Sequence, residues 1–203
     1  FEGQLGGQGI KLDSKSQLMH NKFCVIDNSI TITGSLNPTE NDNYRNNNNI
    51  IVLNSKFLAQ NYNEEFKELW KGEFGGGGKV NYPVVSISGI EIENYFCPED
   101  CQTGLLRIIE LIKNAKDSVK VASFTFTNED VADGLLRADA RGINVSVLVE
   151  NRQRSVLGSQ FERLKGFGMS IKLDGNKYTM HHKFIIIDGK IVIAGSPNFT
   201  LSG

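Results

Sequence analysis

Two patterns of apolar positions divide the chain. Residues 54–71 place apolar side chains at helical spacing behind an Asn-Ser start, which predicts one amphipathic helix. From residue 104 onward, helix-like and strand-like segments alternate. Helices are expected over 104–115, 128–141 and 161–167, and strands over 119–126, 145–149 and 171–173. This alternation predicts an α/β fold with a mixed, mostly parallel sheet flanked by helices.

Four consecutive glycines, Gly75–Gly78, interrupt these patterns and are followed by a short stretch that ends at Pro83. Glycine has no side chain to pack and loses much backbone entropy on folding, so the run is typical of a linker. We therefore predict a first domain over residues 1–74, a linker over 75–83 and a second domain over 84–203.

An internal repeat spans this division. The segment MHNKFCVID at 19–27 returns as MHHKFIIID at 180–188. At the same offset, IKLD at 10–13 matches 171–174, and the Gly-Ser-x-Asn at 34–37 matches 195–198. A register held this long indicates two related structural units.

Each copy reads as a β-hairpin, with Asp-Asn or Asp-Gly between two apolar, β-branched segments. Side chains two residues apart in a strand share a face, so His20 lies with Lys22, and His181 with Lys183. Asp27 and Asp188 belong to the turns and are expected to give structural support.

A two-residue turn would also fix what lies opposite each histidine. Ser35 would face His20, and Ser196 would face His181. One asparagine of each copy would lie on the same face, just beyond its serine. These two residues are Asn37 and Asn198.

Such a patch is suited to a phosphate group. Lysine supplies positive charge, serine and asparagine supply neutral donors, and histidine is a nucleophile or an acid/base near neutral pH. In-line displacement places nucleophile and leaving group on opposite sides of phosphorus, so two histidines from two copies fit this reaction better than one.

The full pattern, H-x-K-x4-D-x6-G-S-x-N, occurs once from His20 to Asn37 and again from His181 to Asn198. It resembles the phospholipase D superfamily with its paired HKD motifs. The resemblance implies two lobes about a pseudo-twofold axis with both motifs in one cleft. It also implies attack by one histidine to give a phosphohistidine, protonation of the leaving group by the other, and no metal or other cofactor.

The chain departs from that family in two ways. Few residues precede the first motif and few follow the second, so the first lobe is expected to be truncated and the second to lack its C-terminal end. A homodimer or another chain would then complete the architecture. In addition, Asn48 stands where the family often has a glutamate that orients the catalytic histidine. Asparagine can orient an imidazole, but it carries no charge.

Composition adds few constraints. The 22 Lys+Arg nearly balance the 23 Asp+Glu, so an anionic partner must be held locally. No apolar run reaches membrane-spanning length and no signal-peptide pattern is present, which predicts a soluble chain and favours the cytoplasm, with a cleaved leader left open. Cys97 and Cys101 could form a local disulfide, hold a metal or remain thiols.

Three functions follow from these features. The favoured one is a metal-independent nuclease acting on DNA or RNA of either strandedness. The second is a phospholipase D or phosphatidyl transferase acting on phospholipid, with Phe124, Phe126, Phe161 and Phe167 as candidate lining if they are not core residues. The third is a catalytically silent scaffold that binds nucleic acid.

Overall fold

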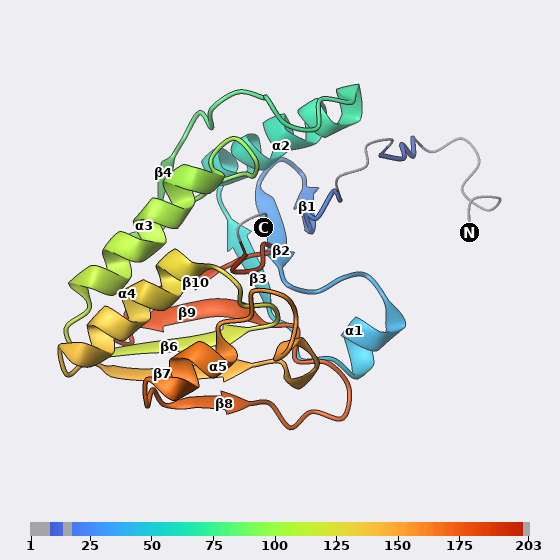
Figure 1. Cartoon of the computed structure of the whole chain (residues 1–203). Coiled ribbons are helices and arrows are strands. Elements are labelled where there is room, and N and C mark those ends of the chain that lie inside the picture. Colours follow the sequence, from blue (N-terminus) through green and yellow to red (C-terminus); the bar gives the residue numbers. More distant parts are fainter. Residues whose placement is uncertain (1–8, 14–17, 201–203) are drawn as a thin grey trace.

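A computed structural model describes residues 9–13 and 18–200. Two groups of elements, which we call the first and second lobes, lie against each other (Figure 1). The first lobe contains a three-stranded antiparallel sheet in the order β1-β2-β3, together with two helices. Its elements are β1 (Phe23–Ile26), β2 (Ile30–Gly34), α1 (Glu40–Tyr44), β3 (Ile50–Asn54) and α2 (Lys56–Lys71).

Helix α2 covers the first sheet and begins where the sequence predicts. The hydroxyl of Ser55 accepts a hydrogen bond from the backbone N–H of Leu58, which satisfies one of the free donors of the first turn. Leu58 and Ala59 are fully buried, and the helix contacts both β1 and β2. The predicted amphipathic helix is therefore confirmed.

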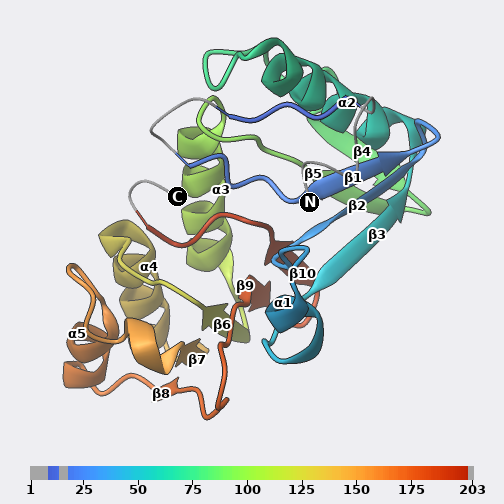
Figure 2. The same ribbon diagram turned by 90° about the vertical axis from the view of Figure 1, so that its right-hand side faces the viewer.

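The second lobe is built on a five-stranded mixed sheet in the order β10-β9-β6-β7-β8, with helices α3, α4 and α5 on one face (Figure 2). Its strands are β6 (Ser118–Ser123), β7 (Asn144–Val149), β8 (Ile171–Leu173), β9 (Lys183–Ile187) and β10 (Ile191–Ala194). Its helices are α3 (Cys101–Asn114), α4 (Glu129–Ala140), α5 (Phe161–Gly166) and the short 3-10 helix η1 (Asn151–Gln153).

Burial of apolar side chains between these helices and the sheet forms the main core. Ile112 of α3, Leu135 of α4 and Leu164 of α5 are fully buried against strand residues that include Val119 and Ile185. Complete burial of such a side chain contributes about 1.5–3 kcal/mol. The Asn128 side chain caps α4 by accepting from the N–H of Val131, as its position in the sequence predicts.

A small antiparallel hairpin, β4 (Val84–Ile87) with β5 (Ile90–Glu93), follows the glycine run. The segments that flank it are tied to the first lobe, because Asn61 of α2 hydrogen-bonds to the backbone of Tyr82 and to the side chain of Asn94. The division into domains at residues 75–83 stays a prediction.

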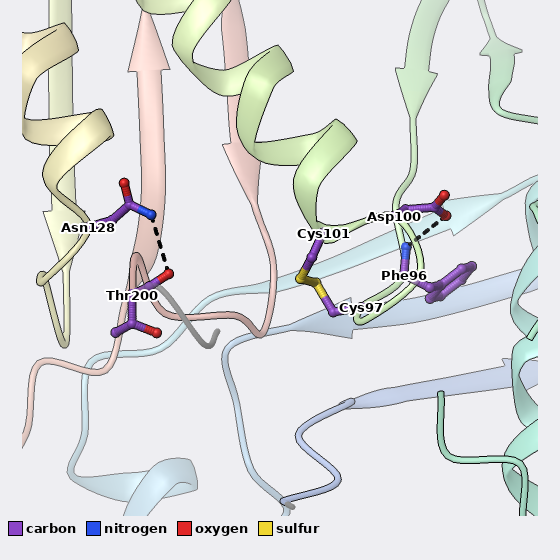
Figure 3. Close-up of a disulfide and its surroundings, with 6 residues drawn as sticks. All are labelled: Phe96, Cys97, Asp100, Cys101, Asn128 and Thr200. Atoms are coloured by element: carbon purple, nitrogen blue, oxygen red, sulfur yellow. Dashed lines mark hydrogen bonds between the residues drawn. A yellow bond between two sulfur atoms is a disulfide. The ribbon is translucent and has the colours of Figure 1, made fainter. Parts of the chain in front are cut away.

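A disulfide joins Cys97 to Cys101 at the start of α3 (Figure 3). The backbone N–H of Phe96 donates to the carboxylate of Asp100 beside it. Of the alternatives that the sequence left open for these cysteines, the structure has the local disulfide.

The predicted mixed sheet flanked by helices is confirmed, but parallel pairs make up half of the strand pairs in the five-stranded sheet. In that sheet β6–β7 and β7–β8 are parallel, whereas β10–β9 and β9–β6 are antiparallel. The repeated motif itself is the reason, since each copy folds as a hairpin, and a hairpin makes antiparallel neighbours.

The hairpin turns fall where the sequence places them, but the pairing is shifted by one residue. Asp27, Asn28, Asp188 and Gly189 all have positive φ, as a type I′ turn requires. One further residue follows each turn, so Ile26 pairs with Ile30, and Ile187 with Ile191. The predicted positions of Ser35 opposite His20 and of Ser196 opposite His181 are therefore wrong.

Candidate functional site

The two His-Lys pairs, which are far apart in the sequence, meet between the lobes. The charges of Lys183 and His181 act on His20, and the charge of Lys22 acts on His181. Within each pair the geometry is the same. Lys22 Nζ donates to the carbonyl of His20 at 2.9 Å, and Lys183 Nζ donates to the carbonyl of His181 at 2.8 Å. The repeat in sequence is thus a repeat in local structure.

Each histidine is held by the serine of the other lobe rather than by its own. His181 Nδ1 lies 3.0 Å from the carbonyl oxygen of Ser35, and His20 makes a backbone hydrogen bond with Ser196. Because a carbonyl only accepts, Nδ1 of His181 carries the proton and Nε2 keeps its lone pair. The exchange of serines between the lobes is what the predicted hairpin register missed.

The position of the Ser35 carbonyl depends on the close approach of the backbone at Gly34 to the backbone at Asn49. Gly34 has a φ of 143°, and a Cβ at this position would lie 2.2 Å from the carbonyl oxygen of Asn49. The N–H of Ser35 donates to the same oxygen. Only glycine fits here, which gives a physical reason for the glycine of the Gly-Ser-x-Asn segment in the first copy.

An asparagine run joins the lobes beside the histidines. The backbone of Asn47 donates to Thr179 O and accepts from the N–H of His181, and Asn46 Oδ1 accepts from the N–H of Thr179. Asn176 Nδ2 donates to Asn47 Oδ1 at 2.6 Å. We did not single out this run as an inter-lobe contact from the sequence, where four asparagines have no periodicity to interpret.

Asn48 contacts His181, the histidine of the opposite lobe. Its Oδ1 lies 3.1 Å from His181 Nδ1 and accepts from the hydroxyl of Ser35. The expected support by Asn48 is compatible with this geometry, although its role stays a prediction.

Asp42, in α1, is a residue of the site that the sequence analysis missed. Its side chain is 5% exposed, and its Oδ2 lies 3.9 Å from His181 Nδ1. The backbone N–H and the side-chain amide of Asn37 donate to Oδ2, and the amide of Asn46 donates to Oδ1. Burial raises the pKa of Asp42, but these hydrogen bonds outweigh it and leave the pKa below its ordinary value. The group is therefore a carboxylate at neutral pH.

Both histidines are neutral in the unliganded site at pH 7. Burial, and then the nearby lysine charges, lower the pKa of His20 to about 4. Burial and Lys183 likewise lower the pKa of His181 to about 4, against the opposing effect of Asp42. Burial and the charge of Lys22 lower the pKa of Lys183 to about 7. An anion between these groups would raise all of these pKa values, so the low values favour binding of an anionic ligand.

The other predicted residues take different positions. Asp188 lies outside the His-Lys cluster, which is the group formed by the two His-Lys pairs. Its carboxylate accepts from the backbone N–H groups of Lys116, Asp117 and Ser118 at the start of β6. These bonds lower the pKa of Asp188. Asp27 is exposed in its turn. Asn37 is directed at Asp42, and Asn198 has a buried Oδ1 for which no hydrogen-bond partner is found among the described residues.

The candidate phenylalanines divide between site and core. Phe124 packs edge-on against the His181 ring, with Lys183 Nζ 5.2 Å from its ring centre. Phe126 and Phe161 are buried in the main core, and Phe167 is exposed. Only Phe124 therefore lies at the His-Lys cluster.

Across residues 9–13 and 18–200, no group of three or more His, Cys, Asp or Glu side chains is arranged to hold a metal ion. No helix within the same ranges has both the length and the apolar character needed to cross a membrane.

Comparison with known proteins identifies the family. A family model described as "Cardiolipin synthase, PLD-like domain" matches residues 3–70 and 108–203, which is most of the chain. The chain belongs to this phospholipase D-like family.

Among curated proteins, the chain is similar to mitochondrial cardiolipin hydrolases. It is 33% identical to the Chlamydomonas reinhardtii protein over 98 residues, covering 48% of this chain and 44% of the relative. It is 34% identical to the Xenopus tropicalis protein over 123 residues, covering 60% and 55%. The chain thus spans about half the length of the curated relatives it matches.

Among solved structures, the chain is similar to NucT from Helicobacter pylori, with 29% identity and a TM-score of 0.49, covering 52% of this chain and 73% of that one. Nuc from Salmonella typhimurium, a phospholipase D family member, has 28% identity and a TM-score of 0.48, covering 52% and 69%. The polyphosphate kinase from Porphyromonas gingivalis aligns over 85% of this chain and 25% of its own, with a TM-score of 0.53 at 13% identity, which indicates a shared fold alone.

Proposed function

We propose that this chain is a phosphodiesterase that hydrolyses nucleic acid through a phosphohistidine intermediate and without a metal ion. One observation carries the proposal: the two pairs interact across the lobes, since Lys183 and His181 act electrostatically on His20, and Lys22 acts on His181 and Lys183. A phosphodiester between them would have one imidazole on each side of phosphorus, with two ammonium groups to offset the charge on the phosphoryl oxygens.

The chemistry proceeds in two displacements. One neutral histidine attacks phosphorus through its ring nitrogen, while the other, protonated, gives its proton to the departing oxygen. The second histidine, now neutral, then takes a proton from water, and the water oxygen displaces the first histidine from phosphorus. Both histidines end in their starting protonation states. The Ser35 carbonyl on Nδ1 would hold the His181 ring in the tautomer that this sequence of steps requires, and the backbone hydrogen bond with Ser196 would help to orient the His20 ring.

A basic and aromatic cluster beside the site supports nucleic acid as the substrate. Tyr178 lies three residues before His181 and is exposed. The guanidinium of Arg45 lies 5.5 Å from the centre of the Tyr178 ring, and Nζ of Lys177 lies 5.9 Å from it. Arg152 donates to Thr179 and to the carbonyl of Lys177 on the same loop. Cations that follow phosphates, together with a ring that stacks on bases, are typical of single-strand binding.

A phospholipid substrate is the second candidate, and a different surface favours it. A mainly apolar pocket has Met19, the residue before His20, in its lining, together with Leu12, Phe66, Trp70 and Phe74. Such a surface would suit acyl chains. The cardiolipin hydrolases to which the chain is similar are named for a phospholipid substrate.

The test is hydrolysis of bis(p-nitrophenyl) phosphate in excess chelator, with single-stranded DNA, RNA and cardiolipin vesicles as parallel substrates. We expect His20→Gln and His181→Gln each to lower the rate by roughly a hundredfold or more. His182→Gln is the matched control and should keep the activity, because the His182 ring lies within hydrogen-bond distance of Asn49 and packs against Phe184.

Faster cleavage of cardiolipin than of DNA or RNA would replace the nuclease proposal with the lipid one. Binding of nucleic acid without hydrolysis of any substrate would indicate the silent scaffold. Activity that depends on added metal would contradict the mechanism.

A further inference from the structure

The His-Lys cluster between the lobes is rich in cationic and neutral nitrogen groups, and the Asp42 carboxylate interacts with it electrostatically. His20, Lys22, His181 and Lys183 all lie within it, and the charge of Asp42 raises the pKa values of Lys22, His181 and Lys183 against the effect of burial. The Asp42 side chain belongs to the five-residue helix α1, which Thr39 caps by accepting from the N–H of Asp42.

The hydrogen bonds of Asp42 hold its charge toward His181. Asn37 and Asn46 donate to its two oxygens, which keeps the carboxylate ionised although it is buried. Its Oδ2 is 3.9 Å from His181 Nδ1, beyond hydrogen-bond distance but within the range of a strong charge interaction. Asn48 Oδ1 and Ser35 O contact Nδ1 directly, so two side chains and one backbone carbonyl surround the same edge of the imidazole.

These contacts divide two roles that a single carboxylate often combines. Asn48 accepts the Nδ1 proton and fixes the ring, but an amide cannot compensate a positive charge. Asp42 does not touch the ring nitrogen, but it carries the charge that Asn48 lacks.

We propose that Asp42 is a positioning residue for His181. The Asp42 carboxylate supplies the negative charge that stabilises the imidazolium form of His181, while Asn48 and Ser35 fix the orientation of the His181 ring. This inference rests on the proposed function, because a charged His181 matters only if the histidine exchanges a proton or a phosphoryl group. Within residues 9–13 and 18–200, the main influences on the pKa of His20 are burial, two lysines, His181 and a backbone hydrogen bond, and none of them is a carboxylate. The two histidines are therefore electrostatically unequal, although their motifs are nearly identical.

The first experiment compares the pH profile of kcat of the parent chain with that of Asp42→Asn, using bis(p-nitrophenyl) phosphate between pH 4 and 9, because kcat reports the pKa values of the substrate complex. The asparagine keeps the size of the side chain and one acceptor but removes the charge. We expect kcat to fall tenfold or more, with KM little changed. The limb of the profile that reports His181 should move to lower pH by about one unit, because removal of a nearby anion destabilises the protonated imidazole. Asp42→Glu, which keeps the charge, should recover part of kcat.

Glu40→Gln is the matched control. Glu40 is also in the first turn of α1 but is exposed, and its replacement should leave the profile unchanged. If Asp42→Asn shows the parent's rate and pH profile, Asp42 is not a positioning residue, and the proposed function still stands.

A second measurement does not depend on activity. The ring resonances of His20, His181 and His182 are followed by NMR between pH 3 and 8 in the parent chain and in Asp42→Asn. We expect the pKa of His181 to fall in the variant, and that of His182, which Asp42 does not affect, to stay constant. An unchanged His181 pKa would overturn the inference even if the chain hydrolysed nothing.

The parent chain provides the same information if Asp42→Asn does not fold. The His181 ring resonance should then show a second step at the pH at which the Asp42 carboxyl resonance titrates, and absence of that step would likewise overturn the inference.

Discussion

The carbonyl oxygen of Ser35 in the first lobe lies 3.0 Å from Nδ1 of His181 in the second. Because a backbone hydrogen bond also joins His20 to Ser196, each lobe holds the imidazole of the other. The site therefore exists only where both copies of the motif are folded and docked, and its geometry depends on backbone positions far from either histidine in the sequence.

Gly34 is the first such position. Gly34→Ala should lower the free energy of unfolding by about 1–3 kcal/mol or more, because the new methyl group would meet the Asn49 carbonyl at 2.2 Å on a backbone with φ of 143°. Denaturant unfolding measures this loss. Gly166→Ala, whose Cβ meets nothing within 4 Å, should change stability little. Equal stability of the two variants would mean that the Ser35–Asn49 approach is not a constraint.

Glu150 supports the segment that leads into His181. This fully buried carboxylate accepts from the N–H of Met180 at 2.6 Å and from that of Arg152 at 3.0 Å. Glu150→Ala would leave buried donors without a partner, so we expect a loss of about 2–4 kcal/mol in thermal or denaturant unfolding. The exposed Glu162 of α5 is the control, and Glu162→Ala should stay within about 0.5 kcal/mol of the parent. A small effect at Glu150 would show that water replaces the carboxylate.

Docking of the lobes should depend on Asn176. Its side chain donates to Asn47 Oδ1 and to the carbonyl of Arg45, both in the first lobe. Asn176→Ala should speed hydrogen exchange at the amides of Asn47 and His181, which pair across the lobes. Asn63→Ala removes a side-chain bond to Asn28 within the first lobe, so exchange at those two amides should not change. Unaltered exchange in Asn176→Ala would mean that the backbone pairing holds the lobes together by itself.

Stability should fall as the pH drops from about 6.5 to about 4. The pKa values of His20 and His181 are near 4 in the folded chain and near 6.5 in an unfolded one, so between these values the unfolded state binds more protons. The free energy of unfolding therefore decreases as the pH falls through this window. The double variant His20→Gln/His181→Gln should show a flatter dependence of unfolding free energy on pH, while His182 contributes equally to both proteins. Parallel curves for the two proteins would contradict the low histidine pKa values.

The sequence by itself determined much of the secondary structure and the composition of the repeat. Helix α2, its Ser55 cap and the Asn128 cap follow from local spacing and local hydrogen bonds, and such interactions lie within a few residues of each other. The positive-φ turns at Asp27 and Asp188 follow from turn chemistry in the same way. The strand period predicted a shared face for His20 with Lys22 and for His181 with Lys183, but the structure places His20 and Lys22 before β1 and His181 before β9.

The tertiary structure decided what the motifs contact. A single extra residue after each turn changed the hairpin register, and local preferences do not specify such a residue. Docking of the lobes then gave each histidine the serine of the other copy, turned the asparagine run into an inter-lobe contact and placed the Asp42 carboxylate near His181. Charge and burial act through space, so the pKa values of the site depend on this packing, to which the order of residues along the chain gives no direct guide.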